Sequence, residues 1–369
     1  MAVDSALADV GLLATRCISR WAAMMTEPLV IQRRTIVPGS RVTLELPLAQ
    51  LYTHTPMTLP AHVVRGRKDG PRLFVSAAIH GDELNGVEVI RRLLRHASLK
   101  GLRGTLLAIP VVNVYGIIQH SRYLPDRRDL NRAFPGVEGG SLAARLAHLF
   151  MSEIVAKCTH GIDLHTGAIH RSNLPQIRAN MDDEATARLA HAFGVPVVIN
   201  ADVRDGSLRE AAAEHGVHML LYEAGEALRF DELSIRAGVQ GIVNVMRELG
   251  MLAKRRRPRT GEPFVARTSA WVRAPASGIL RAIVPLGARI KRNDVIGYIA
   301  DPFGEAEVQV KAPTGGIIIG RTNIPLVHEG EALFHVARFE DVKGVAQQVE
   351  SFQTEQADTL HVTEEPPIV

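Results

Sequence analysis

Short apolar runs recur through the N-terminal part of the chain, and amphipathic stretches separate them. Runs of this length predict buried strands, whereas residues 141–158 have the apolar spacing of a helix that Ser141 can cap. Strands alternating with helices predict a largely parallel or mixed sheet with helices on both faces. We therefore expect an α/β fold whose strands lie at residues 72–79, 104–112, 161–164, 196–200 and 219–222.

The sequence pattern changes near residue 269, where short β-rich runs interrupted by Gly and Pro begin. The segment RAPASGIL at 273–280 is echoed by KAPTGGII at 311–318. Two half-motifs in tandem predict a small all-β barrel or sandwich built by duplication. A helical stretch at 231–252 and a basic, Pro-containing stretch separate this unit from the α/β region.

These patterns divide the chain into five parts. The polar, acidic C-terminal part has few large apolar residues and is expected to be disordered, and the N-terminal leader is expected to be mobile. The parts are a leader at 1–26, the α/β domain at 27–253, a linker at 254–268, the β-rich unit at 269–340 and a disordered tail at 341–369.

Composition excludes several classes of protein. With 46% hydrophobic and 22% charged residues the chain is globular, and it has no run of apolar residues long enough for a transmembrane helix. The excess charge of +4 is concentrated in KRRRPRTG at 254–261 without interleaved aromatic residues, so we expect no nucleic-acid partner. The two cysteines, Cys17 and Cys158, are too few for a disulfide framework, which indicates a reducing, cytoplasmic location.

Histidine and glutamate residues follow the apolar runs at several strand ends. His80 and Glu83 lie in IHGDE, His165 lies in DLHTG, and Glu223 ends the run LLYE. The carboxyl ends of strands in such a sheet meet at one edge, so these side chains are expected to converge. Catalytic zinc commonly takes three protein ligands and keeps a fourth position for water. His80, Glu83 and His165 meet that demand, and Glu223 could accept the proton of the water.

Other residues compete for the supporting roles. A metal-bound imidazole needs a carboxylate or carbonyl to fix its tautomer, and both Asp129 and Asp163 are candidates. Glu226 competes with Glu223, but it follows the turn rather than ending the apolar run. Arginine suits carboxylate binding and oxyanion stabilisation, and Arg122 and Arg132 could divide these two roles. HExxH, P-loop, GxGxxG and GxSxG motifs are absent, and Cys158 is expected to pack in the core.

The motifs together resemble the succinylglutamate desuccinylase/aspartoacylase family of zinc hydrolases, relatives of the zinc carboxypeptidases. HGDE resembles the first metal motif, DLHTG the second, DLNRAFPG the substrate-binding segment and EAG the segment of the catalytic glutamate. The motifs occur in the family's order, and the resemblance covers about residues 29–338. It implies a zinc-carboxypeptidase-like mixed sheet flanked by helices, followed by a lipoyl-like barrel-sandwich.

The resemblance also implies roles for individual residues. One Zn²⁺ per chain would be bound by His80, Glu83 and His165, with Asp129 orienting His80. Asn131 and Arg132 would hold a substrate carboxylate, Arg122 would polarise the scissile carbonyl, and Glu223 would act as general base and then acid. Arg127 and Arg128 lie close enough in the sequence to be confused with Arg122.

The expected activity is hydrolysis of the amide of a small, carboxylate-bearing N-acyl amino acid. A metallocarboxypeptidase acting on a peptide or isopeptide terminus is the alternative, and a non-catalytic binding protein of the same fold is a third. The turn DPFGEAE at 301–307 contains no lysine, so the β-rich unit is not expected to carry lipoyl or biotinyl groups. A wall or lid over the active site is the expected role, and the protein could form a homo-oligomer.

Overall fold

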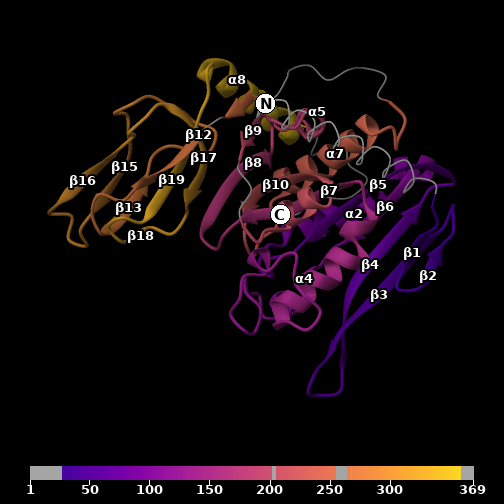
Figure 1. Ribbon diagram of the computed structural model, residues 1–369. Helices are drawn as coiled ribbons and strands as arrows, with labels where there is room; N and C mark the ends of the chain where they lie inside the picture. The colour runs from indigo at the N-terminus through magenta and orange to yellow at the C-terminus, as the bar shows by residue number, and fades with distance from the viewer. Residues whose placement is uncertain (1–26, 202–204, 255–263, 267, 359–369) are drawn as a thin grey trace, which may run out of the picture.

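The computed structural model describes residues 27–201, 205–254, 264–266 and 268–358. It is a mixed α/β protein organised around one large mixed sheet, with helices on both faces (Figure 1). The expected leader and most of the expected linker lie outside the described residues. Residues 264–266 of that linker form strand β11 (Phe264–Ala266), which pairs with β9 (Val197–Asn200).

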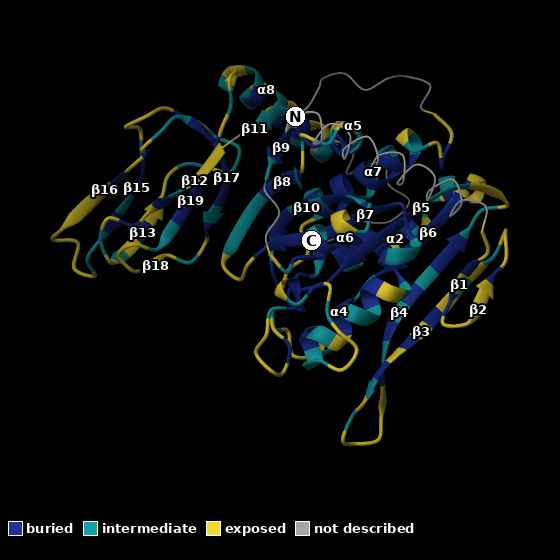
Figure 2. Cartoon of the chain, in the orientation of Figure 1, coloured by how far each residue is buried: buried dark blue, intermediate teal, exposed yellow. Residues whose placement is uncertain are grey.

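Four parallel strands form the centre of the sheet, in the order β6, β5, β7 and β10. Their bounds are β5 (Lys68–Ala77), β6 (Arg103–Ile109), β7 (His160–Gly167) and β10 (His218–Glu226). All eight residues of β7 are buried, and this part of the sheet is dark blue in Figure 2. Together with β9, these strands confirm the five that the apolar runs predict.

Antiparallel strands extend the sheet in both directions. On one side β4 (Pro56–Arg65) pairs with β6, and β3 (Arg41–Gln50) pairs with β4 in a long hairpin. A separate pair, β1 (Leu29–Ile31) and β2 (Arg34–Ile36), lies beside them. On the other side β8 (Arg171–Ala179) runs antiparallel to β10.

Helices cover both faces of the sheet and create two hydrophobic cores. On one face, α2 (Asn85–Arg95), α5 (Glu184–Phe193) and α7 (Glu232–Glu248) pack buried residues such as Ile90, Phe193 and Ile242. On the other, α4 (Leu142–Glu153) and α6 (Leu208–Glu214) pack around Phe150. The short helix α3 (Val114–Ile118) follows β6. Ser141 caps α4 as predicted, by accepting a hydrogen bond from the amide of Ala144.

The C-terminal strands form two layers around a third core that includes Phe334. One layer is the antiparallel sheet of β13 (Gly278–Ala282), β15 (Val295–Ala300), β16 (Glu307–Lys311) and β18 (Leu326–Val327). The other contains β12 (Thr268–Arg273), β14 (Arg289–Ile290), β17 (Gly316–Thr322) and β19 (Ala332–Arg338). The second layer is continuous with the main sheet, because β17 pairs with β8.

The prediction of a disordered tail is wrong for residues 342–358, which form helix α8 (Val342–Asp358). Val345, Val349 and Phe352 are buried, and their spacing places them on one face of the helix. These residues, with Val342 and Ala346 packed beside Val345 and Val349, dock the helix in an otherwise polar segment.

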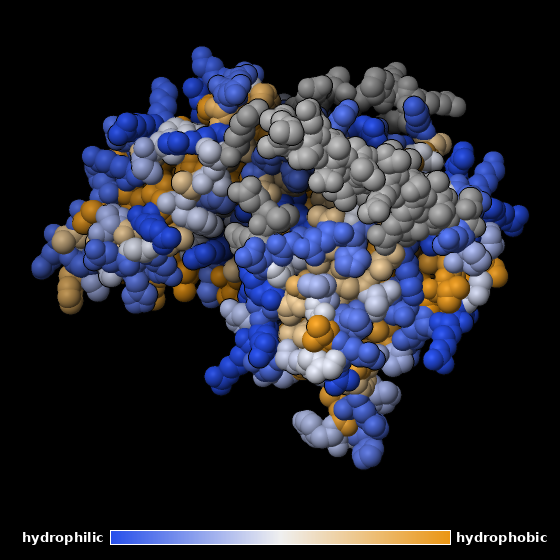
Figure 3. All heavy atoms as spheres, in the orientation of Figure 1, coloured by the Kyte–Doolittle hydropathy of each residue, from blue (hydrophilic) through white to orange (hydrophobic). Residues whose placement is uncertain are grey.

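One face of the molecule is mostly polar (Figure 3). None of the helices formed by described residues is long and apolar enough to cross a membrane. On the face drawn in Figure 3, hydrophilic residues dominate and hydrophobic residues form scattered patches. Cys158 is buried in the core beside α4, and burial raises the pKa of its thiol well above the ordinary value.

Candidate active site

The candidate site lies where β5, β7 and β10 end. Strand β5 ends at Ala77, two residues earlier than the strand predicted at 72–79, so His80 lies in the turn after the strand and not directly at its end. Backbone hydrogen bonds from Val112 to Ala77 and from Asn113 to Ala78 fix the start of this turn. At Gly81 a Cβ would lie 2.0 Å from the backbone of Gly116 in α3, so only glycine allows this close packing.

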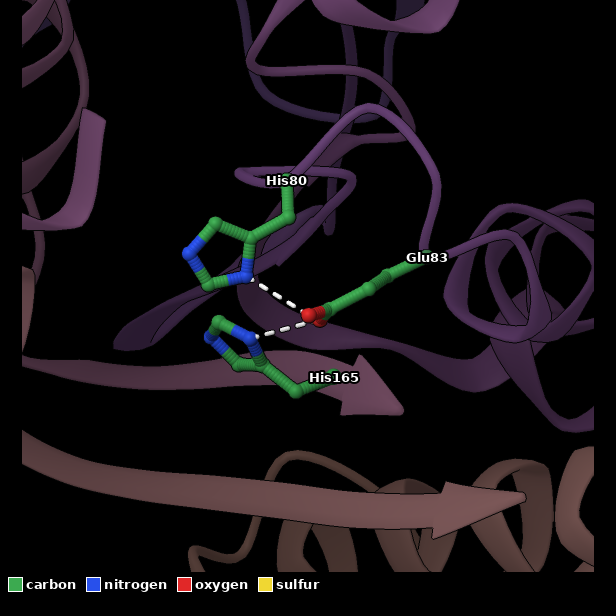
Figure 4. Close-up of side chains that lie close together, drawn as sticks. All are labelled: His80, Glu83 and His165. Atoms are coloured by element: carbon green, nitrogen blue, oxygen red, sulfur yellow. Dashed lines mark hydrogen bonds and ion pairs between the residues drawn. The ribbon is translucent and has the colours of Figure 1, made fainter. Parts of the chain in front are cut away.

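His80, Glu83 and His165 converge on one point, as Figure 4 shows. Nδ1 of His80 lies 2.7 Å from Oε1 of Glu83, and Nδ1 of His165 lies 2.8 Å from Oε2 of the same carboxylate. All three side chains are buried, and one ligand atom from each lies within 4.8 Å of the others. Two imidazole nitrogens and one carboxylate oxygen at this spacing fit the ligand set of a catalytic zinc site.

Both aspartates that the sequence left as alternatives are used, one for each histidine. Oδ1 of Asp129 lies 3.1 Å from Nε2 of His80, and Oδ2 of Asp163 lies 2.7 Å from Nε2 of His165. The Ser76 hydroxyl donates to the other oxygen of Asp163 at 2.8 Å. Each ring therefore has its Nε2 held by a carboxylate, and this contact fixes the ring with its Nδ1 directed at Glu83.

The electrostatics of this cluster favour positive charge between its carboxylates. Burial opposes ionisation of Glu83, but the charges of His80 and His165 lower the pKa of its carboxyl well below the ordinary value. Burial alone would lower the pKa of His80, but the carboxylates of Glu83 and Asp129 outweigh it and raise that pKa above the ordinary value. Burial is similarly outweighed at His165, whose pKa is raised by Asp163 and Glu83. A divalent cation suits the same environment.

Arg122 is the arginine of its segment that reaches the site. Its Nη2 lies 2.9 Å from Oδ2 of Asp129, and its Nη1 lies 3.4 Å from Oε1 of Glu83. Arg127 and Arg128 are exposed, and Arg128 is 3.6 Å from Asp126. The structure thus separates Arg122 from the two neighbours that the sequence could confuse with it.

Asn131 and Arg132 lie on the short 3₁₀ turn Leu130–Arg132, which Asp129 caps. Oδ1 of Asn131 accepts a hydrogen bond from the backbone amide of Leu208 at 2.9 Å, and this bond fixes its side chain. Arg132 donates to the carbonyl of Asn131. Both side chains line the same cavity as His80 and His165.

Glu223 stands beside the histidine cluster. It is the register partner of His165 on the adjacent parallel strand, so the two side chains emerge on the same face of the sheet. Glu226 instead accepts hydrogen bonds from the backbone of His170 and from Asn323, and it does not line the cavity. The glutamate that ends the apolar run is therefore the one at the site.

The cavity has a volume of about 620 Å³, and part of its wall comes from the C-terminal strands. Ser269 and Trp271 on β12 and His335 on β19 line it. The rings of Trp271 and His335 stack with centroids 4.6 Å apart, and the Arg171 guanidinium lies 5.2 Å from the indole. The expected wall over the site is therefore present as a set of lining side chains.

Sequence reasoning missed several residues of this cavity. Its wall includes further polar residues on β8 and near α6, namely Arg171, Asn173, Arg178, Ser207 and Arg209. No motif marks these positions, and they reach the cavity only through strand pairing and helix packing. Strand β8 was also not predicted, because the polar residues that it directs into the cavity interrupt the apolar run expected of a buried strand.

Comparison with known proteins agrees with this geometry. Residues 69–249 match the model of the Succinylglutamate desuccinylase/Aspartoacylase catalytic domain. The chain is 25% identical over 292 residues to the N-alpha-acetyl-L-2,4-diaminobutyric acid deacetylase of Halomonas elongata, covering 76% of this chain and 85% of that one. The segment matched by the family model, residues 69–249, contains His80, Glu83, His165 and Glu223.

Solved structures share the fold. A succinylglutamate desuccinylase/aspartoacylase from Rhodobacter sphaeroides is 25% identical with a TM-score of 0.72, covering 81% of this chain and 96% of that one. The product-bound ectoine utilization protein EutE (DoeB) from Ruegeria pomeroyi is 22% identical with a TM-score of 0.74, covering 84% and 98%. Because those chains are covered almost whole, the likeness extends beyond residues 69–249.

Proposed function

We propose that this chain, which belongs to the succinylglutamate desuccinylase/aspartoacylase family, is a zinc-dependent hydrolase that cleaves the amide of a small N-acyl amino acid. The observation that carries the proposal is the buried cluster of His80, Glu83 and His165, with Glu223 in register beside it. The deacetylase from Halomonas elongata supports amide hydrolysis as the reaction.

Zinc would be held by Nδ1 of His80, Nδ1 of His165 and the Glu83 carboxylate. When bound, it would lower the pKa of a water molecule and polarise the scissile carbonyl. Asp129 and Asp163 keep the two imidazole rings in the orientation that this binding needs, through their contacts with Nε2.

Glu223 would move the proton. Its carboxylate would take a proton from the attacking water as the water bonds to the carbonyl carbon, and then deliver that proton to the nitrogen of the leaving amine. Arg122, held at the cavity wall by Asp129, would stabilise the negative charge that develops on the carbonyl oxygen. The products are a carboxylic acid and a free amino acid.

The direct test is a screen of zinc-loaded protein against N-acetyl and N-succinyl amino acids, with release of the free amine as the readout. Tripeptides belong in the same screen, because the same residues could serve a metallocarboxypeptidase. The wall formed by Trp271 and His335 favours a small substrate. Turnover of tripeptides equal to that of N-acyl amino acids would overturn this substrate class.

Arg132→Met is expected to weaken recognition of the substrate carboxylate. Loss of a charge-assisted hydrogen bond should lower kcat/KM by roughly 10- to 100-fold, mainly through KM, since such bonds contribute about 1.5–3 kcal/mol. The measurement compares each N-acyl amino acid with its carboxamide, which lacks the negative charge. Wild type should prefer the acid, and the variant should lose that preference.

Arg128→Met is the matched control, because Arg128 is exposed and does not line the cavity. It should keep the wild-type preference for the acid over the carboxamide. An Arg132→Met protein that still discriminates between the two substrates would remove Arg132 from carboxylate binding.

A further inference from the structure

Within the part of the chain that the structure describes, the hydrogen bonds and the ion pair of the Glu223 carboxylate all fall on one of its two oxygens. Nδ2 of Asn173 donates to its Oε2 at 2.9 Å, Nε2 of Gln176 approaches the same oxygen at 3.4 Å, and Nε of Arg178 lies 3.2 Å from it. All three neighbours lie on β8, the antiparallel partner of β10. The other oxygen, Oε1, makes no hydrogen bond or ion pair with a residue that the structure describes. One oxygen is therefore anchored, and the other is free for chemistry.

Asn173 in turn belongs to a row of residues that crosses into the C-terminal strands. It pairs with Gly225 on β10 and with Gly320 on β17, and Gly320 pairs with His335 on β19. His335 is the register partner of Trp271 on β12. Residues paired in this way lie side by side on one face of a sheet, so the row links the cavity wall to the neighbourhood of Glu223.

Gly320 determines the space available to Asn173. A Cβ at position 320 would lie 2.8 Å from Oδ1 of Asn173 and 3.3 Å from Cβ of His335. The first distance is shorter than side chains tolerate, so any larger residue would displace the Asn173 amide. The backbone of Gly320 is not in the left-handed region, and the need for glycine here is one of space.

We propose that Asn173 and Arg178 are positioning residues for the Glu223 carboxylate, and that Gly320 on the C-terminal strand β17 maintains the place of Asn173. The inference rests on the proposed function, since it assumes that Glu223 transfers the proton. It makes the C-terminal unit part of the apparatus that orients the general base, in addition to a wall of the cavity. Asn173 and Arg178 act through Glu223 and not on the substrate.

Asn173→Asp tests the first half of the proposal, because it preserves the size of the side chain but replaces the donating amide with an oxygen. We expect kcat to fall by roughly 10- to 100-fold, the range for a lost hydrogen bond to a charged group, with KM changed less than about twofold. Arg178→Lys, which keeps the charge, should retain more activity than Arg178→Met. Zinc content and melting temperature should stay at wild-type values in Asn173→Asp.

The role of Gly320 is tested with two proteins, the single variant Gly320→Ala and the double variant Gly320→Ala/Asn173→Ala. Gly320→Ala alone should lower kcat, and a crystal structure of it should show the Asn173 amide turned away from Glu223. In the Asn173→Ala background the same replacement should have no further effect, because the displaced group is already absent. Gly101→Ala is the control, since a Cβ at that position meets nothing within 4 Å.

The outcomes separate this inference from the proposed function. If zinc-loaded wild type hydrolyses no N-acyl amino acid, both fail. If wild type is active and Glu223→Gln is not, but Asn173→Asp and Arg178→Met keep the wild-type kcat, the positioning role alone is wrong. Equal losses from Gly320→Ala in the wild-type and Asn173→Ala backgrounds would show that Gly320 does not act through Asn173.

Discussion

Replacing Glu223 with glutamine is expected to lower kcat by about 10²- to 10⁴-fold, the usual contribution of a general acid–base residue. Glutamine has the size of glutamate and can still accept from Asn173, but its amide cannot take up the proton of the attacking water. The proposed zinc ligands are unchanged, so we expect the metal content to remain about one per chain. Initial rates and elemental analysis on the same preparation provide the measurement.

Glu226→Gln is the control for that experiment, because Glu226 lies on the same strand and outside the cavity. Its activity should be close to that of wild type. A Glu223→Gln protein with near-native kcat, or a loss of the same size in Glu226→Gln, would remove Glu223 from the proton transfer.

His165→Ala is expected to abolish zinc binding and, with it, turnover. The replacement removes one of the three proposed ligand atoms, leaves Asp163 without its imidazole partner and leaves Glu83 with the imidazole of His80 alone. Zinc at 100 times its Kd should stabilise wild type by about 2.7 kcal/mol, and the variant should gain none of this. The measurement is the melting temperature with zinc and with a chelator, beside elemental analysis.

His160→Gln is the matched control, since His160 is a buried histidine at the start of the same strand and does not line the cavity. It should bind zinc as wild type does. Should His165→Ala fail to fold, the response of wild type to the chelator still decides the question. A wild-type protein that takes up no zinc and shows no shift would overturn the metal site.

The cluster of His80, Glu83 and His165 was predictable because its signals are local. Apolar runs that end near His80, His165 and Glu223 predict convergence at the carboxyl edge of a parallel sheet, and the structure brings these residues together. The residue pattern alone left Asp129 and Asp163 as alternatives, and only the family resemblance assigned Asp129 to His80, where the structure places it. That choice depends on the path of the loop after α3, which no local pattern specifies.

The rest of the cavity depends on long-range pairing, which the sequence does not reveal. Asn173 and His335 are separated by most of the C-terminal half of the chain, and they meet only because β17 pairs with both β8 and β19. Between strands so far apart in the sequence, the register is set by how the sheet faces pack. A shift of one residue would move every side chain of the strand to the opposite face of the sheet. Helix α8 was missed for a simpler reason, because its apolar residues are few.

The pairing of β17 with β8 has a consequence for how proteins of this architecture can be recombined. The first half of β8 is joined to the C-terminal unit by backbone hydrogen bonds, and its second half is joined to β9. A protein shortened before β12 would leave an open strand edge beside Asn173, and open edges invite aggregation. A chimera that carries the C-terminal unit of a relative would have a different strand register where β17 pairs with β8. We expect such exchanges to be tolerated when the donor unit supplies a matching edge strand with a glycine opposite Asn173, where a Cβ would lie 2.8 Å from the Asn173 amide oxygen.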